Sequence, residues 1–154
     1  MLPFFEWCQN AGLIVAMRRS LWIFPVIESL HLMGLALLGG SILMVDLRLL
    51  GLGFERQPAS QVARDGQRWL LASLFVMLPT GFLLFMASAV KCYYLPAFWV
   101  KMTTLLLALA FTFTVRRHVA AADPIAIGPA KIAAVVSLAL WGSVAIAGRL
   151  VGFP

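Results

Sequence analysis

Residues 28–48 read ESLHLMGLALLGGSILMVDLR, an apolar run with an acid and a histidine near one end and Asp-Leu-Arg at the other. A helix needs about 20 apolar residues to cross roughly 30 Å of hydrocarbon. The window around this run, residues 23–50, is long enough and predicts a membrane span. Ionisable residues are costly inside a span, so Glu28, His31 and Asp46 need a reason to be there.

The composition of the whole chain also predicts a membrane protein. Of the 154 residues, 62% are hydrophobic and 12% are charged, whereas soluble domains have about 25% charged residues. A soluble fold of this size cannot bury so much apolar surface. Three further apolar windows lie at 69–90, 97–115 and 131–151, and no linker or repeat divides the chain. We expect one transmembrane domain, 1–154, with an all-α fold: an integral membrane four-helix bundle.

The residues before the first span predict an interfacial helix at 2–19. Its apolar part is too short to cross, and its two arginines follow that part instead of preceding it, unlike those of a signal peptide. Its aromatic residues suit the headgroup zone: Phe4, Phe5 and Trp7. A frayed tail is the alternative.

Prolines and glycines predict the breaks between and within the spans. The polar connection 51–68 is expected to hold a short helix beginning near Pro58. Pro79, followed by Thr80 and Gly81, predicts a kink in the second span. The connection 116–130 contains turn signals, and His118 beside two arginines is expected in the headgroup region.

Basic residues predict the orientation, because cytoplasmic loops carry an excess of Lys and Arg. One side of the bundle receives seven: Arg48, Arg56, Arg64, Arg68, Arg116, Arg117 and Lys131. The other receives five: Arg18, Arg19, Lys91, Lys101 and Arg149. The first side is therefore expected in the cytoplasm and both termini in the periplasm of a bacterial inner membrane. The net charge of +6 suits anionic headgroups, and no nucleic-acid motif is present.

The two cysteines, Cys8 and Cys92, both fall on the predicted periplasmic face. Such a pair can form a disulfide that ties the N-terminal helix to the second span. The alternative is two free thiols that pack as small apolar side chains.

Charged residues in the first and fourth spans share one spacing. Glu28 and Asp46 are 18 residues apart, which is five helical turns, so they lie on one stripe about 27 Å long. Lys131 and Arg149 repeat the spacing with opposite sign. Since the two spans run antiparallel, the acids and bases lie at matching depths.

This spacing predicts that the first and fourth spans pack together, with Gly39 and Gly142 allowing close approach. Glu28–Arg149 would pair at the outer end and Asp46–Lys131 at the inner end. His31 and Lys101 lie at the depth of the outer pair, so a polar cluster is expected there: Glu28, His31, Lys101 and Arg149. The alternative is that the charges simply extend to the nearest interface.

Three functions remain open for this cluster. It can be structural, holding the bundle, a partner subunit or a lipid headgroup in an accessory, non-catalytic protein. It can bind copper or haem b through a possible metal set of His31, Met86 and Met102. It can belong to a proton or ion path through Glu28 and Asp46. Enzyme motifs are absent, so we do not expect catalysis.

Several segments together resemble a family of small bacterial inner-membrane proteins of unknown function: ESLHLMG, DLRLLG, FWVKM and LWGSVAIAGRL. The likeness runs from about Trp22 to the C-terminus. It implies a four-span bundle in which seven residues match the family pattern: Glu28, His31, Asp46, Arg48, Lys101, Trp141 and Arg149. It implies no activity, and FTFTVRRH departs from the pattern, so His118 receives no family role. A looser likeness to copper-resistance membrane proteins favours copper by analogy.

Overall fold

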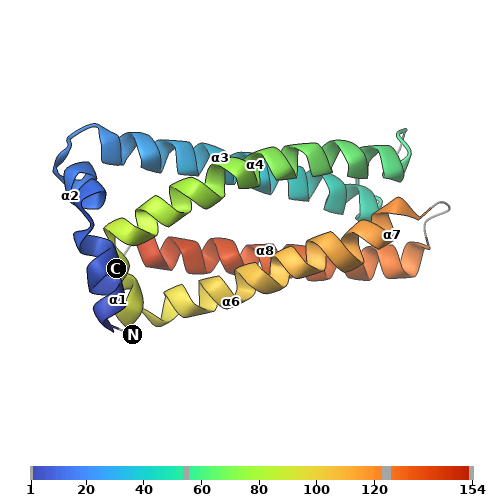
Figure 1. The fold of residues 1–154 in the computed structure, drawn as a ribbon. Helices are drawn as coiled ribbons and strands as arrows, with labels where there is room; N and C mark the ends of the chain where they lie inside the picture. Colours follow the sequence, from blue (N-terminus) through green and yellow to red (C-terminus); the bar gives the residue numbers. More distant parts are fainter. Residues whose placement is uncertain (1, 54–55, 123–125, 153–154) are drawn as a thin grey trace.

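The computed structural model describes residues 2–53, 56–122 and 126–152. Within this part of the chain, four helical segments are long and apolar enough to cross a membrane, and no strand is present. They are α3 (Ile23–Leu50), α4 (Ala59–Ala87), the segment Pro96–Ala121 and α8 (Ile127–Gly152). The segments alternate in direction, so both termini lie at one end of the bundle (Figure 1). The predicted all-α four-helix bundle is confirmed.

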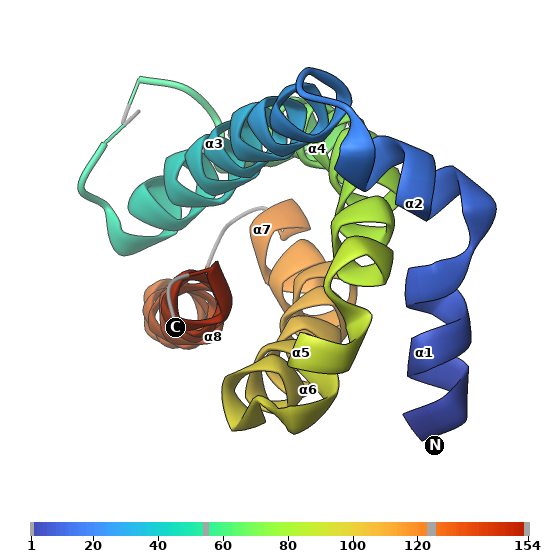
Figure 2. The same cartoon turned by 90° about the vertical axis from the view of Figure 1, so that its left-hand side faces the viewer.

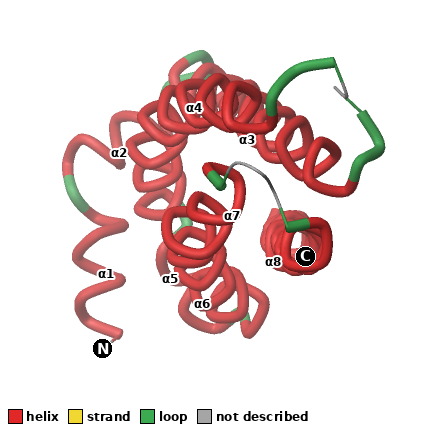
Figure 3. The backbone as a smooth tube through the Cα atoms, turned by 90° about the vertical axis from the view of Figure 1, so that its right-hand side faces the viewer, coloured by secondary structure: helices red, strands yellow, loops and turns green. Residues whose placement is uncertain are grey.

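We call the end with the chain termini the terminal end. The opposite end, which carries the connections after α3 and before α8, is the loop end (Figure 3). The third spanning segment reaches the loop end through three consecutive helices: α6 (Pro96–Phe111), the π-helical turn η1 (Thr112–Arg116) and α7 (Arg117–Ala121). It is seven residues longer than the window 97–115 that predicted it, because the helix begins one residue earlier and continues past residue 115 to Ala121.

Both ends of α3 follow from local sequence. At its start, the Ser20 hydroxyl accepts a hydrogen bond from the Ile23 N–H at 3.2 Å. At its end, Gly51 has a φ of +76°, a left-handed conformation that glycine adopts without steric cost. The Leu52 N–H then bonds to the Leu47 carbonyl at 3.0 Å, which completes a Schellman motif. Helix α3 thus covers the same residues as the apolar window, 23–50.

Helix α4 begins about ten residues before the predicted span. The short helix expected near Pro58 is continuous with the span, and Pro58 is its N-cap residue. Pro79 lies inside the helix, which bends along its length (Figure 1). The Thr80 hydroxyl donates to the Val76 carbonyl at 2.7 Å. A side chain next to the proline thus bonds to a backbone carbonyl of the preceding turn.

The N-terminal segment forms two helices instead of the single one predicted for 2–19. These are α1 (Leu2–Asn10) and α2 (Gly12–Arg19), which meet at Ala11. They lie across the terminal end, beside α4 and the short helix α5 (Ala89–Tyr94) (Figure 2). Phe4 and Trp7 are exposed, but Phe5 is buried against Phe85 and Tyr93. The segment therefore has two different faces. One face packs on the end of the bundle, and the other carries exposed aromatic rings.

Helix α3 packs most extensively against α4, while α6 packs against α8. Helix α3 also contacts α8, which confirms the predicted contact between the first and fourth spans. That contact does not use the predicted glycines. A Cβ atom added to Gly39 or Gly142 would meet nothing within 4 Å. The prediction of close approach at these glycines is wrong, because both face open space.

The close approach lies between α3 and α4. A Cβ atom on Gly34 would lie 2.8 Å from Met77 Cγ and 3.7 Å from the Ser73 carbonyl oxygen. A Cβ atom on Gly66 would contact Val45 and lie 3.4 Å from the Ser41 carbonyl oxygen. Each helix therefore presents a glycine and, seven residues later, a buried serine. Small residues at this spacing let two antiparallel backbones approach.

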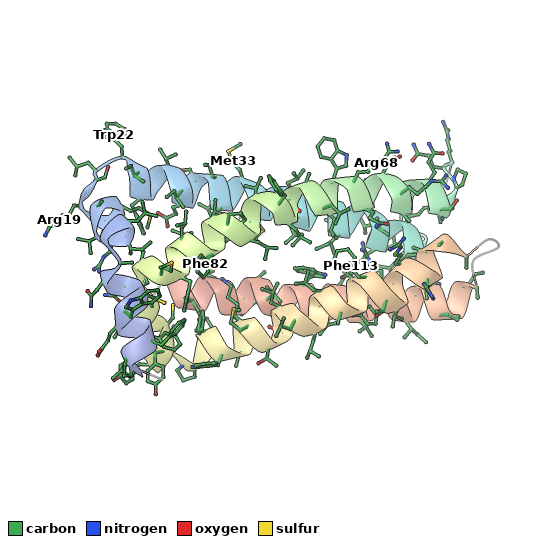
Figure 4. All side chains as sticks on the ribbon, viewed as in Figure 1. Arg19, Trp22, Met33, Arg68, Phe82 and Phe113 are labelled. Atoms are coloured by element: carbon green, nitrogen blue, oxygen red, sulfur yellow. The ribbon has the colours of Figure 1, made fainter. Side chains whose placement is uncertain are left out.

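Two apolar clusters fill the bundle. The central cluster joins α3, α4, α6 and α8 through Leu38, Ile42, Leu70, Ala108, Trp141 and Val144. The second lies nearer the loop end and contains Val45, Leu49, Val62, Ala120, Ala130 and Ala134. Other apolar side chains remain on the outside, where the bilayer would cover them. Trp22 and Met33 project away from the bundle in Figure 4 and are 79% and 69% exposed.

Candidate functional site

A buried ion pair joins the first and third spanning segments near the loop end. Arg116 Nε donates to Asp46 Oδ1 at 2.6 Å, and Arg116 Nη2 donates to the Ile42 carbonyl at 3.1 Å. Asp46 is fully buried and Arg116 nearly so. Asp46 lies four residues before the end of α3, or about 6 Å along the axis. The two opposite charges compensate each other inside the bundle.

The π-helical turn η1 positions this arginine. A π turn accommodates one extra residue, which rotates everything after it by about 100° relative to a continuous α-helix. Arg116 is the last residue of η1 and points inward, while its neighbour Arg117 is exposed. The sequence predicts both arginines on the cytoplasmic surface. That assignment is wrong for Arg116, because the turn carries it to the Asp46 carboxylate.

The same turn makes a second buried contact, with α8. Trp141 Nε1 donates to Thr112 Oγ1 at 3.0 Å, and both residues are buried. Thr112 and Arg116 are four residues apart, so they lie on one face of the turn. The candidate functional site therefore connects α3, η1 and α8 through Asp46, Arg116, Thr112 and Trp141.

Two polar atoms of this site retain unused hydrogen-bonding capacity. Asp46 Oδ2 and Ser137 Oγ are buried, and neither has a hydrogen-bond partner among the described residues. Ser137 of α8 lies near the carboxylate but outside hydrogen-bonding geometry. Buried polar groups are rarely left unsatisfied. A water molecule between them would satisfy both.

A cavity of about 240 Å³ lies beside Arg116, between α4 and the third spanning segment. Its polar lining residues are Ser60, Arg64, Gln67, Thr112, Arg116 and Arg117. None of its described lining residues is acidic. A small cavity with a basic lining therefore lies next to the buried pair at the loop end. Its charge and size suit water or a small anion.

The predicted inner pair is wrong in its basic member. Arg116, not Lys131, forms the ion pair with Asp46. Lys131 is exposed near the start of α8 and lines a different cavity. The matched spacing of acids and bases fixed their depths only, whereas the rotation of each helix about its axis decides which side chains meet.

At the terminal end, the structure brings together two of the four residues predicted for the outer cluster. His31 is half-buried, and its Nδ1 atom lies 3.0 Å from Thr80 Oγ1. Because that hydroxyl donates to Val76, the imidazole must be the donor in this contact. A Cβ atom on Gly81 would lie 3.1 Å from His31 Cε1, so the histidine ring occupies the space that glycine leaves.

Lys101 enters the same region from α6. It is half-buried, within electrostatic range of His31, and lies over α8, where a Cβ atom on Gly148 would be 3.6 Å from its Cε. Glu28 and Arg149 are exposed on α3 and α8. The Glu28–Arg149 pair therefore stays a prediction. His31 and Lys101 do lie in one region, and Thr80 is the hydrogen-bond partner of His31 that the sequence did not predict.

The three residues of the possible metal set, His31, Met86 and Met102, lie in different environments. Met86 packs beneath the N-terminal helices, against Ile14 and Met17. Met102 is exposed. Among the described residues, no group of three or more His, Cys, Asp or Glu is arranged to hold a metal ion. His31 Nε2 is the ring nitrogen left for a ligand, since Nδ1 contacts Thr80.

Cys8 and Cys92 are both buried free thiols. They lie on α1 and α5, two helices in contact at the terminal end. Burial raises the pKa of the Cys92 thiol, and the nearby ammonium groups of Lys101 and Lys91 oppose that shift. A raised pKa keeps Cys92 protonated at neutral pH, which disfavours its attack on oxidants or metals.

The fold and site together define a multi-pass four-helix membrane protein with an ion pair buried between its helices. The chain belongs to the family of unknown function DUF6644, whose profile matches residues 4–154. No curated protein and no solved structure matches it. The family match covers most of the chain, and the function of the family is not known. The likenesses to small bacterial inner-membrane proteins and to copper-resistance proteins stay predictions.

Proposed function

We propose that this chain is a non-catalytic accessory subunit of a bacterial inner membrane, which binds a partner protein through its outer surface. The observation that carries the structural, non-catalytic part of the proposal is the Asp46–Arg116 pair. The carboxylate of Asp46 and the guanidinium of Arg116 compensate each other and hold α3 to the third spanning segment. Neither charge therefore needs a substrate to compensate it. Holding two helices together explains why the pair lies inside the bundle, although burying two charges has a large desolvation penalty.

The interior also argues against conduction. Glu28 and Asp46 lie in opposite halves of α3, and the central apolar cluster lies between their levels. Leu38, Ile42 and Trp141 of this cluster are each less than 9% exposed. A proton or ion path between the two acids would have to open this packing. The accessory role needs no such opening.

Partner binding rests on charge exposed on a spanning helix. Glu28 is exposed on α3, six residues into a helix with a candidate span. Charged side chains on spanning helices usually pair with another group. We place the loop end in the cytoplasm, where six basic residues remain after burial of Arg116, and both termini in the periplasm.

Site-specific photocrosslinking in the native membrane tests the accessory role. A photoreactive amino acid at Met33, which is 69% exposed, should give one protein adduct of defined mass. The same group at Leu38, which is 3% exposed, is the matched control and should give none, because it faces the chain's own interior. Lipid adducts alone at Met33 and at other exposed α3 positions would contradict partner binding through this surface.

Copper or haem binding at His31 is the second candidate, favoured by the ring's position inside the spanning region with Nε2 uncommitted to Thr80. An absorbance spectrum and metal analysis of the detergent-purified protein test it. A Soret band or stoichiometric copper that disappears in His31→Ala but persists in His118→Ala would support it. A colourless, metal-free wild-type protein would remove it.

A further inference from the structure

A second and larger cavity, of about 530 Å³, lies at the loop end. It forms where the end of α3, the start of α4 and the start of α8 meet. The connection after α3 lies on the same side of the bundle as α8 (Figure 3). Its lining includes Arg48, Leu49, Leu50, Gly51, Ser60 and Lys131. The cavity belongs neither to the buried ion pair nor to the proposed partner surface.

The charge of this cavity has one sign. Arg48 reaches it from α3 and Lys131 from α8, and none of its described lining residues is acidic. Arg48 Nε donates to the Gln57 carbonyl at 3.1 Å, which orients the side chain toward the connection after α3. Among the described residues, no hydrogen bond is found for the two terminal guanidinium nitrogens of Arg48. A guanidinium with free donors can bind an oxyanion through two parallel hydrogen bonds.

Backbone donors add to this set. Ala59 and Ser60 line the cavity and form the first turn of α4, whose N-cap residue Pro58 makes no side-chain capping bond. The first N–H groups of a helix have no acceptor inside it. They therefore reinforce the attraction of the two basic side chains for an anion.

We propose that this cavity binds the phosphate group of an anionic membrane lipid. The depth is right, because a helix of 28 residues such as α3 is about 42 Å long and extends beyond a hydrocarbon core of about 30 Å. Arg48 lies two residues from the end of α3 and is thus at headgroup level. The volume is also within the range of about 300–1,000 Å³ typical of ligand pockets.

The apolar part of the lining favours a lipid over a soluble phosphate. Leu49 and Leu50 form one wall, and Ile127, which is 72% exposed, stands at the rim. A phospholipid can place its phosphate between Arg48 and Lys131 while its acyl chains follow these apolar side chains. A soluble phosphate would use the basic groups but gain nothing from the leucines.

Lipid titration of the purified protein tests the proposal. In a neutral detergent, short-chain phosphatidylglycerol should raise the melting temperature in a saturable manner, while short-chain phosphatidylcholine should not. The double variant Arg48→Gln/Lys131→Gln should bind phosphatidylglycerol at least about tenfold more weakly, because two charge-assisted contacts are lost. The matched control Arg18→Gln/Arg19→Gln removes two exposed arginines at the terminal end and should bind as the wild type.

Pyrophosphate in place of the lipid separates the two sources of phosphate. Weak or absent stabilisation by pyrophosphate supports the lipid. Equal stabilisation by pyrophosphate, lost in Arg48→Gln/Lys131→Gln, would keep the anion site but overturn its assignment to lipid. Equal responses to both phospholipids, or an unchanged response in the cavity variant, would overturn the site itself.

Discussion

Replacing Arg116 with methionine is expected to destabilise the folded bundle by about 3–5 kcal/mol. The substitution retains much of the side-chain volume but leaves Asp46 as an uncompensated charge that is fully buried. It also removes the donor to the Ile42 carbonyl. The free energy of unfolding, measured by denaturant titration in detergent micelles, gives the result directly.

Arg117→Met is the matched control, because Arg117 is the next residue in the chain and is exposed. Its effect should stay within about 0.5 kcal/mol. The double variant Asp46→Leu/Arg116→Met should be more stable than Arg116→Met alone, since replacing both members of a buried pair with apolar groups removes the stranded charge. Equal stabilities of the Arg116 and Arg117 variants would show that the pair is not buried in the protein.

Replacing Gly66 with leucine is expected to disrupt the contact between α3 and α4. Any side chain at this position meets Val45 and approaches the backbone of Ser41. Overpacking typically costs about 1–3 kcal/mol, and a leucine against a backbone belongs at the upper end. The loss must also exceed the gain of about 1 kcal/mol from replacing a helical glycine. Thermal unfolding followed by circular dichroism measures the net effect.

Gly39→Leu is the control for this prediction, because it makes the same substitution on the same helix pair. A Cβ atom at Gly39 meets nothing within 4 Å, so only the gain in helix propensity remains and the variant should be at least as stable as the wild type. If Gly39→Leu is instead the more damaging change, α3 packs through the face that its sequence spacing predicted. The pair of variants thus decides between the two arrangements.

The spans could be predicted from sequence because their signals are local. Membrane thickness sets the length of an apolar helix, and Gly51 ends α3 through its own backbone conformation. The start of α4 was predicted less well, since the polar residues between Pro58 and Trp69 form one helix with the span. Hydropathy detects only the part of a helix that lies in lipid. The polar turns by which the same helix extends beyond the lipid have no hydropathy signal.

The site was predicted only in part. Asp46 was singled out because an acid inside a span needs a partner, and His31 and Lys101 because of their shared depth. The sequence did not predict Arg116 as the partner of Asp46. A signal was present, because Asp46 lies near the loop end of the first span and Arg116 and Arg117 lie at the loop end of the third. Residue spacing assumed an unbroken α-helix, and the π turn at Thr112–Arg116 broke that assumption.

The amino-acid sequence by itself determined that this chain is a membrane bundle, how many spans it has, and the depth of each charged residue. These properties depend on apolar length and on a rise of 1.5 Å per residue, which are local. Only the tertiary structure decided which charges meet and which glycines are covered. Those outcomes depend on how each helix is rotated about its axis, and one π turn or one tight glycine contact shifts that rotation.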